Sequence, residues 1–192
     1  MDTLATIVKD DICSFLEGNK ELLFNERDFQ MHLATYLSNT KKYDDVDVEY
    51  YVPFTELDNY IWKNELRIDI VVRKGQEYLP VELKYKTKKV KQKISRFGEE
   101  LTQDGVMKNQ GAQDLGRYNF WKDIRRVELV HKRFKNIKNG LAVFLTNDNY
   151  YLKAGREDSN CIKFSMTESE HDRVKSWLDT ESRCVRDNKI SQ

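Results

Sequence analysis

The sequence lacks an excess of charge of either sign, and it lacks any long apolar run. Thirty-three Lys and Arg residues are matched by 32 Asp and Glu residues, so the 192-residue chain has a net charge of +1. This balance excludes a global field that would draw the protein to nucleic acid or to a membrane. No run of about 18 apolar residues is present to span a bilayer, so we expect no membrane partner. Any site for a polyanion must therefore be a local patch.

Several motifs that would indicate other classes of protein are also missing. The start, MDTLATIVKDD, has neither the basic nor the apolar region of a signal peptide, which predicts a cytoplasmic protein. The three cysteines, Cys13, Cys161 and Cys184, are scattered, and so are the three histidines, so neither a disulfide framework nor a structural zinc site is expected. Without a Gly-rich phosphate loop, a dinucleotide fingerprint or a clustered nucleophile and histidine, a small-molecule enzyme ranks last.

The composition is that of a folded domain. Hydrophobic residues make up 39% of the chain and aromatic residues 11%, which is too much for a disordered protein. A chain of this length can bury a sizeable core, and we see no internal repeat and no linker. We therefore expect a single domain over residues 1–192.

Hydrophobic periodicity predicts a mixed α/β core with a central sheet flanked by helices. Asn25 is the expected N-cap of the second helix, and residues 84–105 are expected to form a lysine-rich loop or mobile flap. The predicted helices cover residues 3–17, 24–39, 106–134 and 168–179, and the predicted strands cover residues 46–54, 66–74, 77–85, 140–146 and 161–166.

The second and third strands form a predicted hairpin whose turn sets the register. In RKGQ, a type II′ turn places Gly75 first and Gln76 second of the two central residues. Lys74 then pairs with Glu77, and counting back along the strands places Asp69 opposite Glu82. The same count places Arg67 opposite Lys84 on that polar face. The other face carries apolar residues expected to pack inward: Leu66, Ile68, Ile70, Val72, Val81, Leu83 and Tyr85.

Two facing carboxylates need a cation. Directly opposed side chains have Cβ atoms about 4.5 to 5.5 Å apart, and like charges in that position destabilise a sheet. Lys84, two residues beyond Glu82 on the same face, is one candidate. A divalent metal is the other, and oxygen ligands that leave open positions suit Mg²⁺. A solvated strand face would also show a charged residue at every second position, so Asp69 by itself does not identify a site. Glu26, near the start of the second predicted helix, could be there only to complement the helix dipole.

The combination of motifs resembles the PD-(D/E)XK nuclease superfamily, which has the restriction-endonuclease-like fold. RID ends at Asp69 as the first acid, VELK supplies Glu82 and Lys84, and the resemblance spans about residues 24–146. It implies that Asp69 and Glu82 bind the metal, that Lys84 assists the attacking water, and that Glu26 on the preceding helix completes the catalytic and metal site. Ile68 stands where the name-giving proline would be.

Two further segments offer candidate contacts to a substrate. Gln113 is similar to the glutamine of a glutamine-tyrosine motif in RecB-like members, although Tyr118 lies one residue further on than that motif expects. Arg117 shares the helix side of Gln113 by spacing, and both could instead only solubilise the helix. The run from Lys84 to Lys93, which includes Lys86 and Lys88, could contact phosphates or form a solvated loop.

The leading hypothesis is a Mg²⁺-dependent nuclease, with Mn²⁺ as a substitute, that hydrolyses phosphodiester bonds of nucleic acid, with DNA the expected substrate. The alternative is a nuclease-like fold that binds nucleic acid or protein without cleaving it, because fold does not establish function. No recognition domain accompanies the predicted core. Specificity would therefore come from a homodimer or a partner protein, or be absent.

Overall fold

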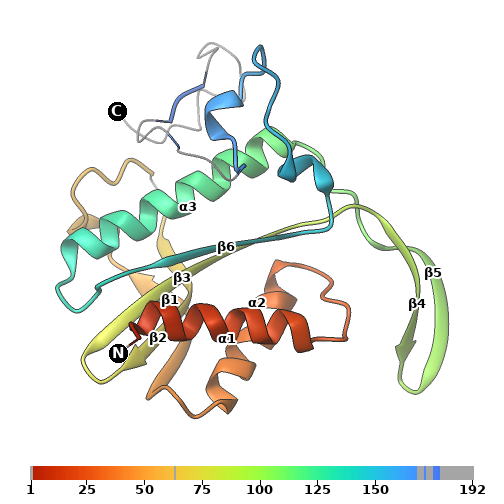
Figure 1. Cartoon of the computed structure of the whole chain (residues 1–192), viewed down its shortest axis with the longest axis horizontal. Coiled ribbons are helices and arrows are strands. Elements are labelled where there is room, and N and C mark those ends of the chain that lie inside the picture. The colour runs from red at the N-terminus through yellow and green to blue at the C-terminus, as the bar shows by residue number, and fades with distance from the viewer. Residues whose placement is uncertain (1, 63, 168–170, 172–174, 178–192) are drawn as a thin grey trace.

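The computed structural model of the chain describes residues 2–62, 64–167, 171 and 175–177 (Figure 1). The helices are α1 (Leu4–Gly18), α2 (Glu26–Asn39) and α3 (Gln113–Arg133). The strands are β1 (Asp45–Val52), β2 (Leu66–Lys74), β3 (Glu77–Lys86), β4 (Val90–Arg96), β5 (Glu99–Met107) and β6 (Leu141–Thr146). Three short 3₁₀ helices are η1 (Phe54–Glu56), η2 (Asn149–Leu152) and η3 (Ile162–Phe164).

The central sheet has four strands in the order β1-β2-β3-β6. The first two pairs are antiparallel and the β3–β6 pair is parallel, so the sheet is mixed. Helices α1 and α2 cover one face of the sheet and α3 covers the other (Figure 1). The predicted mixed α/β core, with a mixed central sheet and flanking helices, is therefore confirmed. No helix in the described part of the chain is both long enough and apolar enough to cross a membrane.

The start of α2 shows how the local sequence fixes a helix that carries a candidate site residue. The Asn25 side chain accepts the backbone N–H of Asp28 at 2.9 Å, which confirms Asn25 as the N-cap. The Asp28 carboxylate in turn accepts the backbone N–H of Phe24 at 2.9 Å. This reciprocal pair satisfies two otherwise free N–H groups and begins the helix at Glu26.

The apolar residues of β2 divide between the two faces of the sheet. Ile70 and Val72 pack in the core under α1 and α2, whereas Leu66 and Ile68 pack in the core under α3. The prediction that all four share one inward face is therefore wrong. The change of face falls at Asp69. In the neighbouring strand β1, Glu49 lies between the residues paired with Ile70 and Ile68, and it has φ 52, the kind of backbone irregularity that re-aims side chains.

The lysine-rich segment forms an arm rather than a loop. Strands β4 and β5 pair with each other in a separate two-stranded sheet that extends from the body of the protein (Figure 1). Residues 99–107 pair with 90–96, so α3 begins at Gln113 instead of the predicted residue 106. The sequence alternates too weakly between polar and apolar residues here to reveal a ribbon that is exposed on both faces.

The last part of the chain also departs from the prediction. Residues 140–146 were expected to form a buried strand, and β6 is indeed a strand, but its six residues are only half-buried at the edge of the sheet. The strand predicted at residues 161–166 is absent, and η3 occupies that position. There Phe164 is buried against Tyr118 of α3, so packing of a short turn replaces strand pairing. The helix predicted at 168–179 lies mostly outside the described residues.

Candidate active site

The hairpin register agrees with the prediction from the turn as far as Ile70 and Val81, but the predicted pairing of Arg67 with Lys84 is not among the pairs of β2 and β3. Gly75 has φ 59 and Gln76 has no positive φ, as a type II′ turn requires. The paired residues run from Lys74 and Glu77 at the turn to Ile70 and Val81. Asp69 and Glu82 follow directly beyond this last pair.

Strands β2 and β3 separate beyond the Ile70–Val81 pair. There, acidic side chains accept the backbone N–H groups of β3 that carbonyl groups of β2 would accept in a continuous sheet. The Asp69 carboxylate accepts the backbone N–H of Leu83 at 2.6 Å. Two residues further along β3, the Glu26 carboxylate of α2 accepts the backbone N–H of Tyr85 at 2.9 Å. Each acid thus satisfies a backbone donor that would otherwise be free at the opening between the strands. This geometry brings Glu26 and Asp69 to the same stretch of β3 as Glu82 and Lys84.

Lys84 joins two acids from opposite sides of the sheet. Its Nζ lies 3.3 Å from Glu26 Oε1 and 3.1 Å from Oδ2 of Asp123 on α3. Burial alone would lower the pKa of Lys84, but the charges of Asp123 and Glu26 outweigh it and raise this pKa above its ordinary value. Lys84 is therefore held as an ammonium group.

A second cation, Arg126 of α3, contacts Glu82 and Asp123. Arg126 Nη1 lies 3.4 Å from Glu82 Oε1 and 3.2 Å from Asp123 Oδ1. Arg126 Nη2 also donates a hydrogen bond to the backbone carbonyl of Arg67 at 3.0 Å, which fixes the side chain against the start of β2. Sequence reasoning missed both Asp123 and Arg126. Their only signal is the three-residue spacing on a helix, which many exposed ion pairs share.

Carboxyl groups outnumber the cations that contact them. Glu26, Asp69, Glu82 and Asp123 gather around Lys84 and Arg126, an arrangement with two surplus negative charges when these six groups are ionised, or one when the nearby Lys122 of α3 is also counted as charged. Burial raises the pKa of Asp69. Burial and the nearby charge of Asp123 also raise the pKa of Glu82 well above its ordinary value, although Arg126 opposes the rise. These shifts express chiefly the energetic cost of burying a charged carboxylate, to which the neighbouring acids add.

The same surplus indicates which residues could hold a metal ion. Within the described residues, Glu82 Oε1 is buried and accepts no hydrogen bond, although the charge of Arg126 lies 3.4 Å from it. The described residues contain no group of three or more His, Cys, Asp or Glu side chains arranged to hold a metal. Both Glu26 oxygens are already engaged, by Lys84 and by Tyr85 N–H. Asp69 Oδ2 accepts the Leu83 N–H and Glu82 Oε1 faces Arg126, so each of these two carboxyl groups has one further oxygen that could bind Mg²⁺, an ion that binds through one or two carboxylates and keeps several waters.

Arg117, predicted to contact substrate, lies inside the protein. Its side chain is fully buried, and Nη2 donates hydrogen bonds to the carbonyls of Tyr150 at 3.1 Å and Lys153 at 2.6 Å. The guanidinium also lies 4.9 Å from the centre of the Tyr150 ring. Arg117 thus fastens the segment around η2 to α3, and this arrangement does not present it to a substrate.

Gln113, Lys86 and Lys88 lie nearer the surface. Gln113 begins α3, and its Nε2 lies 3.5 Å from Oδ2 of Asp148, whose other oxygen lies 2.8 Å from Lys88 Nζ. Lys86 ends β3 and is half-buried, and Lys88 is half-exposed in the connection to β4. Both lysines therefore lie on the path from Lys84 to the arm, where a phosphate could reach Lys88.

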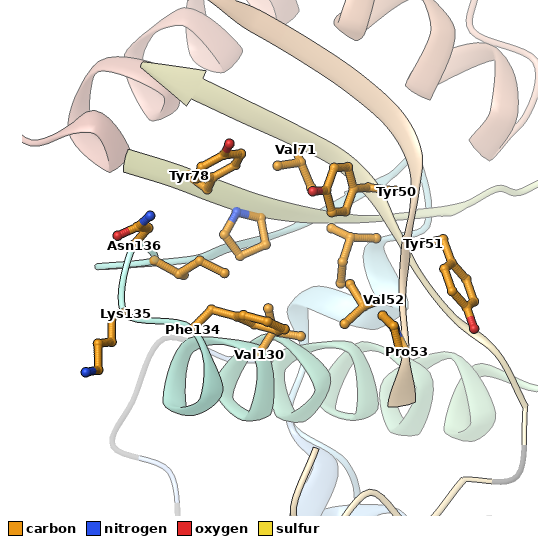
Figure 2. A pocket seen from close by; sticks show the side chains of 13 residues that line it. Tyr50, Tyr51, Val52, Pro53, Val71, Tyr78, Val130, Phe134, Lys135 and Asn136 are labelled. Carbon is orange, nitrogen blue, oxygen red and sulfur yellow. The ribbon is translucent and has the colours of Figure 1, made fainter. Parts of the chain in front are cut away.

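A separate cavity of about 370 Å³ lies on the α3 side of the sheet, between β1–β3 and the end of α3 (Figure 2). Figure 2 shows Tyr50, Tyr78 and Phe134 around it, with Val71 and Val130 from the core. Its lining is mainly apolar and includes none of the residues of the candidate active site. It is a distinct feature of the fold.

Comparison of the chain with protein-family models, with curated proteins and with solved structures found no match. The resemblance to nucleases therefore depends on the residues and on their geometry. What the geometry adds is the convergence of Asp69, Glu82, Lys84 and Glu26 at one opening in the sheet.

Proposed function

We propose that this chain is a metal-dependent nuclease that hydrolyses phosphodiester bonds of nucleic acid, with DNA as the expected substrate. The observation that supports the proposal is the meeting of Asp69, Glu82 and Lys84 where β2 leaves β3, with surplus negative charge around a buried Glu82 oxygen that accepts no hydrogen bond and lies 3.4 Å from Arg126. Asp69 and Glu82 would hold Mg²⁺, or Mn²⁺ in its place. A bound divalent ion supplies a water of lowered pKa and stabilises negative charge on the phosphate.

Lys84 has a different role from that of a base. Its raised pKa keeps it protonated, so it cannot take a proton from the attacking water. Its ammonium group can donate hydrogen bonds to a phosphate oxygen or to the water and can stabilise negative charge as it develops. Glu26 and Asp123 position this ammonium group from α2 and α3.

A second candidate function, a nuclease-like module that binds without cleaving, is supported by Arg126. This arginine lies 3.4 Å from the Glu82 carboxylate and supplies a positive charge from the protein itself. If that ion pair persists when nucleic acid is bound, Glu82 is neutralised without a metal. The two functions then differ in whether Arg126 moves away from Glu82 so that a metal ion can bind there.

The deciding experiment is a cleavage assay with Mg²⁺ and with Mn²⁺ on linear duplex, circular duplex, single-stranded DNA and RNA. We expect the wild type to cleave DNA and Glu82→Gln to lose about a hundredfold or more of that rate, because the lost charge acts in the transition state. Glu128→Gln is the matched control, since Glu128 on α3 is exposed and pairs with Arg125 at 2.9 Å. A wild type that binds nucleic acid but cuts none of the four substrates would favour the binding module.

A further inference from the structure

The β4–β5 arm ends in an exposed aromatic residue. At its base Lys88 is anchored to Asp148, and near its end the Arg96 guanidinium lies 4.6 Å from the centre of the Phe24 ring. A groove lies between this part of the arm and the segment that joins α1 to α2. Beyond these contacts the chain turns at Phe97 and Gly98, and the Phe97 side chain is fully exposed.

The turn is a poor place for phenylalanine as far as folding is concerned. Phe97 has φ 54 and Gly98 has φ 85, the positive values that a type I′ hairpin turn requires at both central positions. Asn or Gly is preferred at the first of these positions, because a larger side chain is strained in the left-handed region. The ring gains no burial in return. A strained and fully exposed aromatic residue indicates a contact outside the chain.

The distribution of charge on the arm indicates what the contact is. Within the arm, residues 90–107, the three basic residues lie on β4 and the three acidic residues on β5, so the arm itself has no net charge, and Lys86, Lys88, Lys89 and Lys108 flank it. All six charged residues from Lys86 to Arg96 are basic, and this stretch begins two residues after Lys84. A basic strand therefore connects the candidate active site with the tip. Lys93 pairs only loosely, at 3.7 Å, with Glu100, and both side chains are more than 70% exposed, so a phosphate could replace the carboxylate.

We propose that the β4–β5 arm is a nucleic-acid contact in which Phe97 stacks on a nucleobase while Lys91 and Lys93 contact backbone phosphates. Basic residues that follow the backbone, combined with an aromatic ring that takes the face of a base, form a recurring arrangement in proteins that bind nucleic acid. A membrane surface fits less well, because one exposed ring on a narrow ribbon offers little apolar area to bury. The inference deepens the proposed function, since it names how the substrate of that same site is held.

The test measures binding without divalent ions, so that it does not depend on cleavage. Fluorescence anisotropy of a labelled oligonucleotide, single-stranded or annealed to its complement, is recorded in EDTA with the full chain. Phe97→Asn should weaken binding about five- to a hundred-and-fiftyfold, the range for loss of one base–aromatic stack, and Phe97→Tyr should bind like wild type. Leu152→Ala is the control, because Leu152 is an exposed apolar residue outside the arm.

Salt dependence separates the two parts of the contact. Phe97→Asn should leave the slope of log affinity against log salt unchanged, because the ring neutralises no phosphate. The double variant Lys91→Gln/Lys93→Gln should reduce the magnitude of that slope by about 2 on duplex DNA. An unchanged slope in the double variant would overturn the assignment of these lysines.

A 2-aminopurine probe in each oligonucleotide shows whether Phe97 stacks on an unpaired base or inserts between base pairs. Quenching on the single strand indicates stacking on an unpaired base, and an increase on the duplex indicates a wedge between base pairs; Phe97→Asn should abolish either signal. The proposal is overturned if Phe97→Asn binds both forms within about twofold of wild type, or if wild type binds neither. It is also overturned if sedimentation shows self-association that Phe97→Asn removes, because the ring would then belong to an interface between copies. A chain that passes these tests and cleaves nothing contradicts only the proposed nuclease activity.

Discussion

The carboxylate of Asp69 accepts the backbone N–H of Leu83 at 2.6 Å at the point where strand β2 leaves strand β3. The same acid that would hold a metal therefore also completes the sheet. Glu26 does likewise for Tyr85, so the opening between the strands is maintained by two candidate site residues. Structure and chemistry share these side chains, and a substitution can affect either.

Two substitutions of Asp69 separate these effects. Asp69→Asn keeps an oxygen that can accept the Leu83 N–H and removes a charge that burial and Glu26 make costly. Asp69→Ala removes the acceptor as well. We therefore expect Asp69→Ala to unfold with a free energy about 1–3 kcal/mol lower than Asp69→Asn, the cost of a buried donor left without a partner. Urea unfolding at neutral pH measures the difference. Equal stabilities would mean that Leu83 N–H finds another acceptor.

The buried acids also predict how stability depends on pH in the metal-free protein. The folded-state pKa of Glu82 is raised, chiefly by burial and by the charge of Asp123, and the pKa of Asp69 is raised by burial. Above the ordinary glutamate pKa of 4.5, the folded state thus retains protons that the unfolded state has released. The stabilising contribution of these retained protons is complete below that pH and is lost as pH rises through the folded-state pKa.

We therefore expect the free energy of unfolding of the wild type to fall as pH rises from mildly acidic to mildly basic values. Glu82→Gln cannot lose this proton, so its profile should be flatter, and Glu128→Gln should follow the wild type because Glu128 is exposed. Urea denaturation across the pH series measures all three. A Glu82→Gln profile as steep as that of the wild type would place the titration on another group.

The sequence predicted the parts of the site that depend on neighbouring residues. The turn at Gly75 fixes the register that brings Asp69 next to Glu82, and Asn25 fixes the start of the helix that carries Glu26. Both are determined within a few residues of chain. They therefore remain predictable without knowledge of the distant contacts.

What the sequence could not predict depends on packing between distant segments. Asp123 and Arg126 join the site only because α3 crosses that face of the sheet, about 40 residues after Glu82. Arg117 is polar in sequence, but the segment around η2 covers it, and that segment shows no periodic pattern. The same spacing along a helix can mark an exposed or a buried arginine, and only the covering segment decides between them.

Arg126 leads to the last prediction, which concerns competition between a side chain and a metal for the same carboxylates. Arg126→Met leaves Glu82 and Asp123 without their guanidinium partner at 3.4 and 3.2 Å, and breaking such a buried pair costs about 3–5 kcal/mol. A divalent ion on Asp69 and Glu82 would restore the missing positive charge. Mn²⁺ should therefore raise the melting temperature of Arg126→Met more than that of the wild type.

The control is Arg125→Met, because Arg125 directly precedes Arg126 on α3 but pairs with the exposed Glu128. This variant should respond to Mn²⁺ like the wild type. Adding Glu82→Gln to Arg126→Met should abolish the extra shift if the ion binds at this pair, since stabilisation grows with the affinity of the folded state for the ligand. Equal Mn²⁺ shifts in Arg126→Met and the wild type would show that Arg126 does not compete with the ion. A shift in the variant alone would show that the acids can hold a metal which the arginine normally excludes, and this result would favour the binding module over the nuclease.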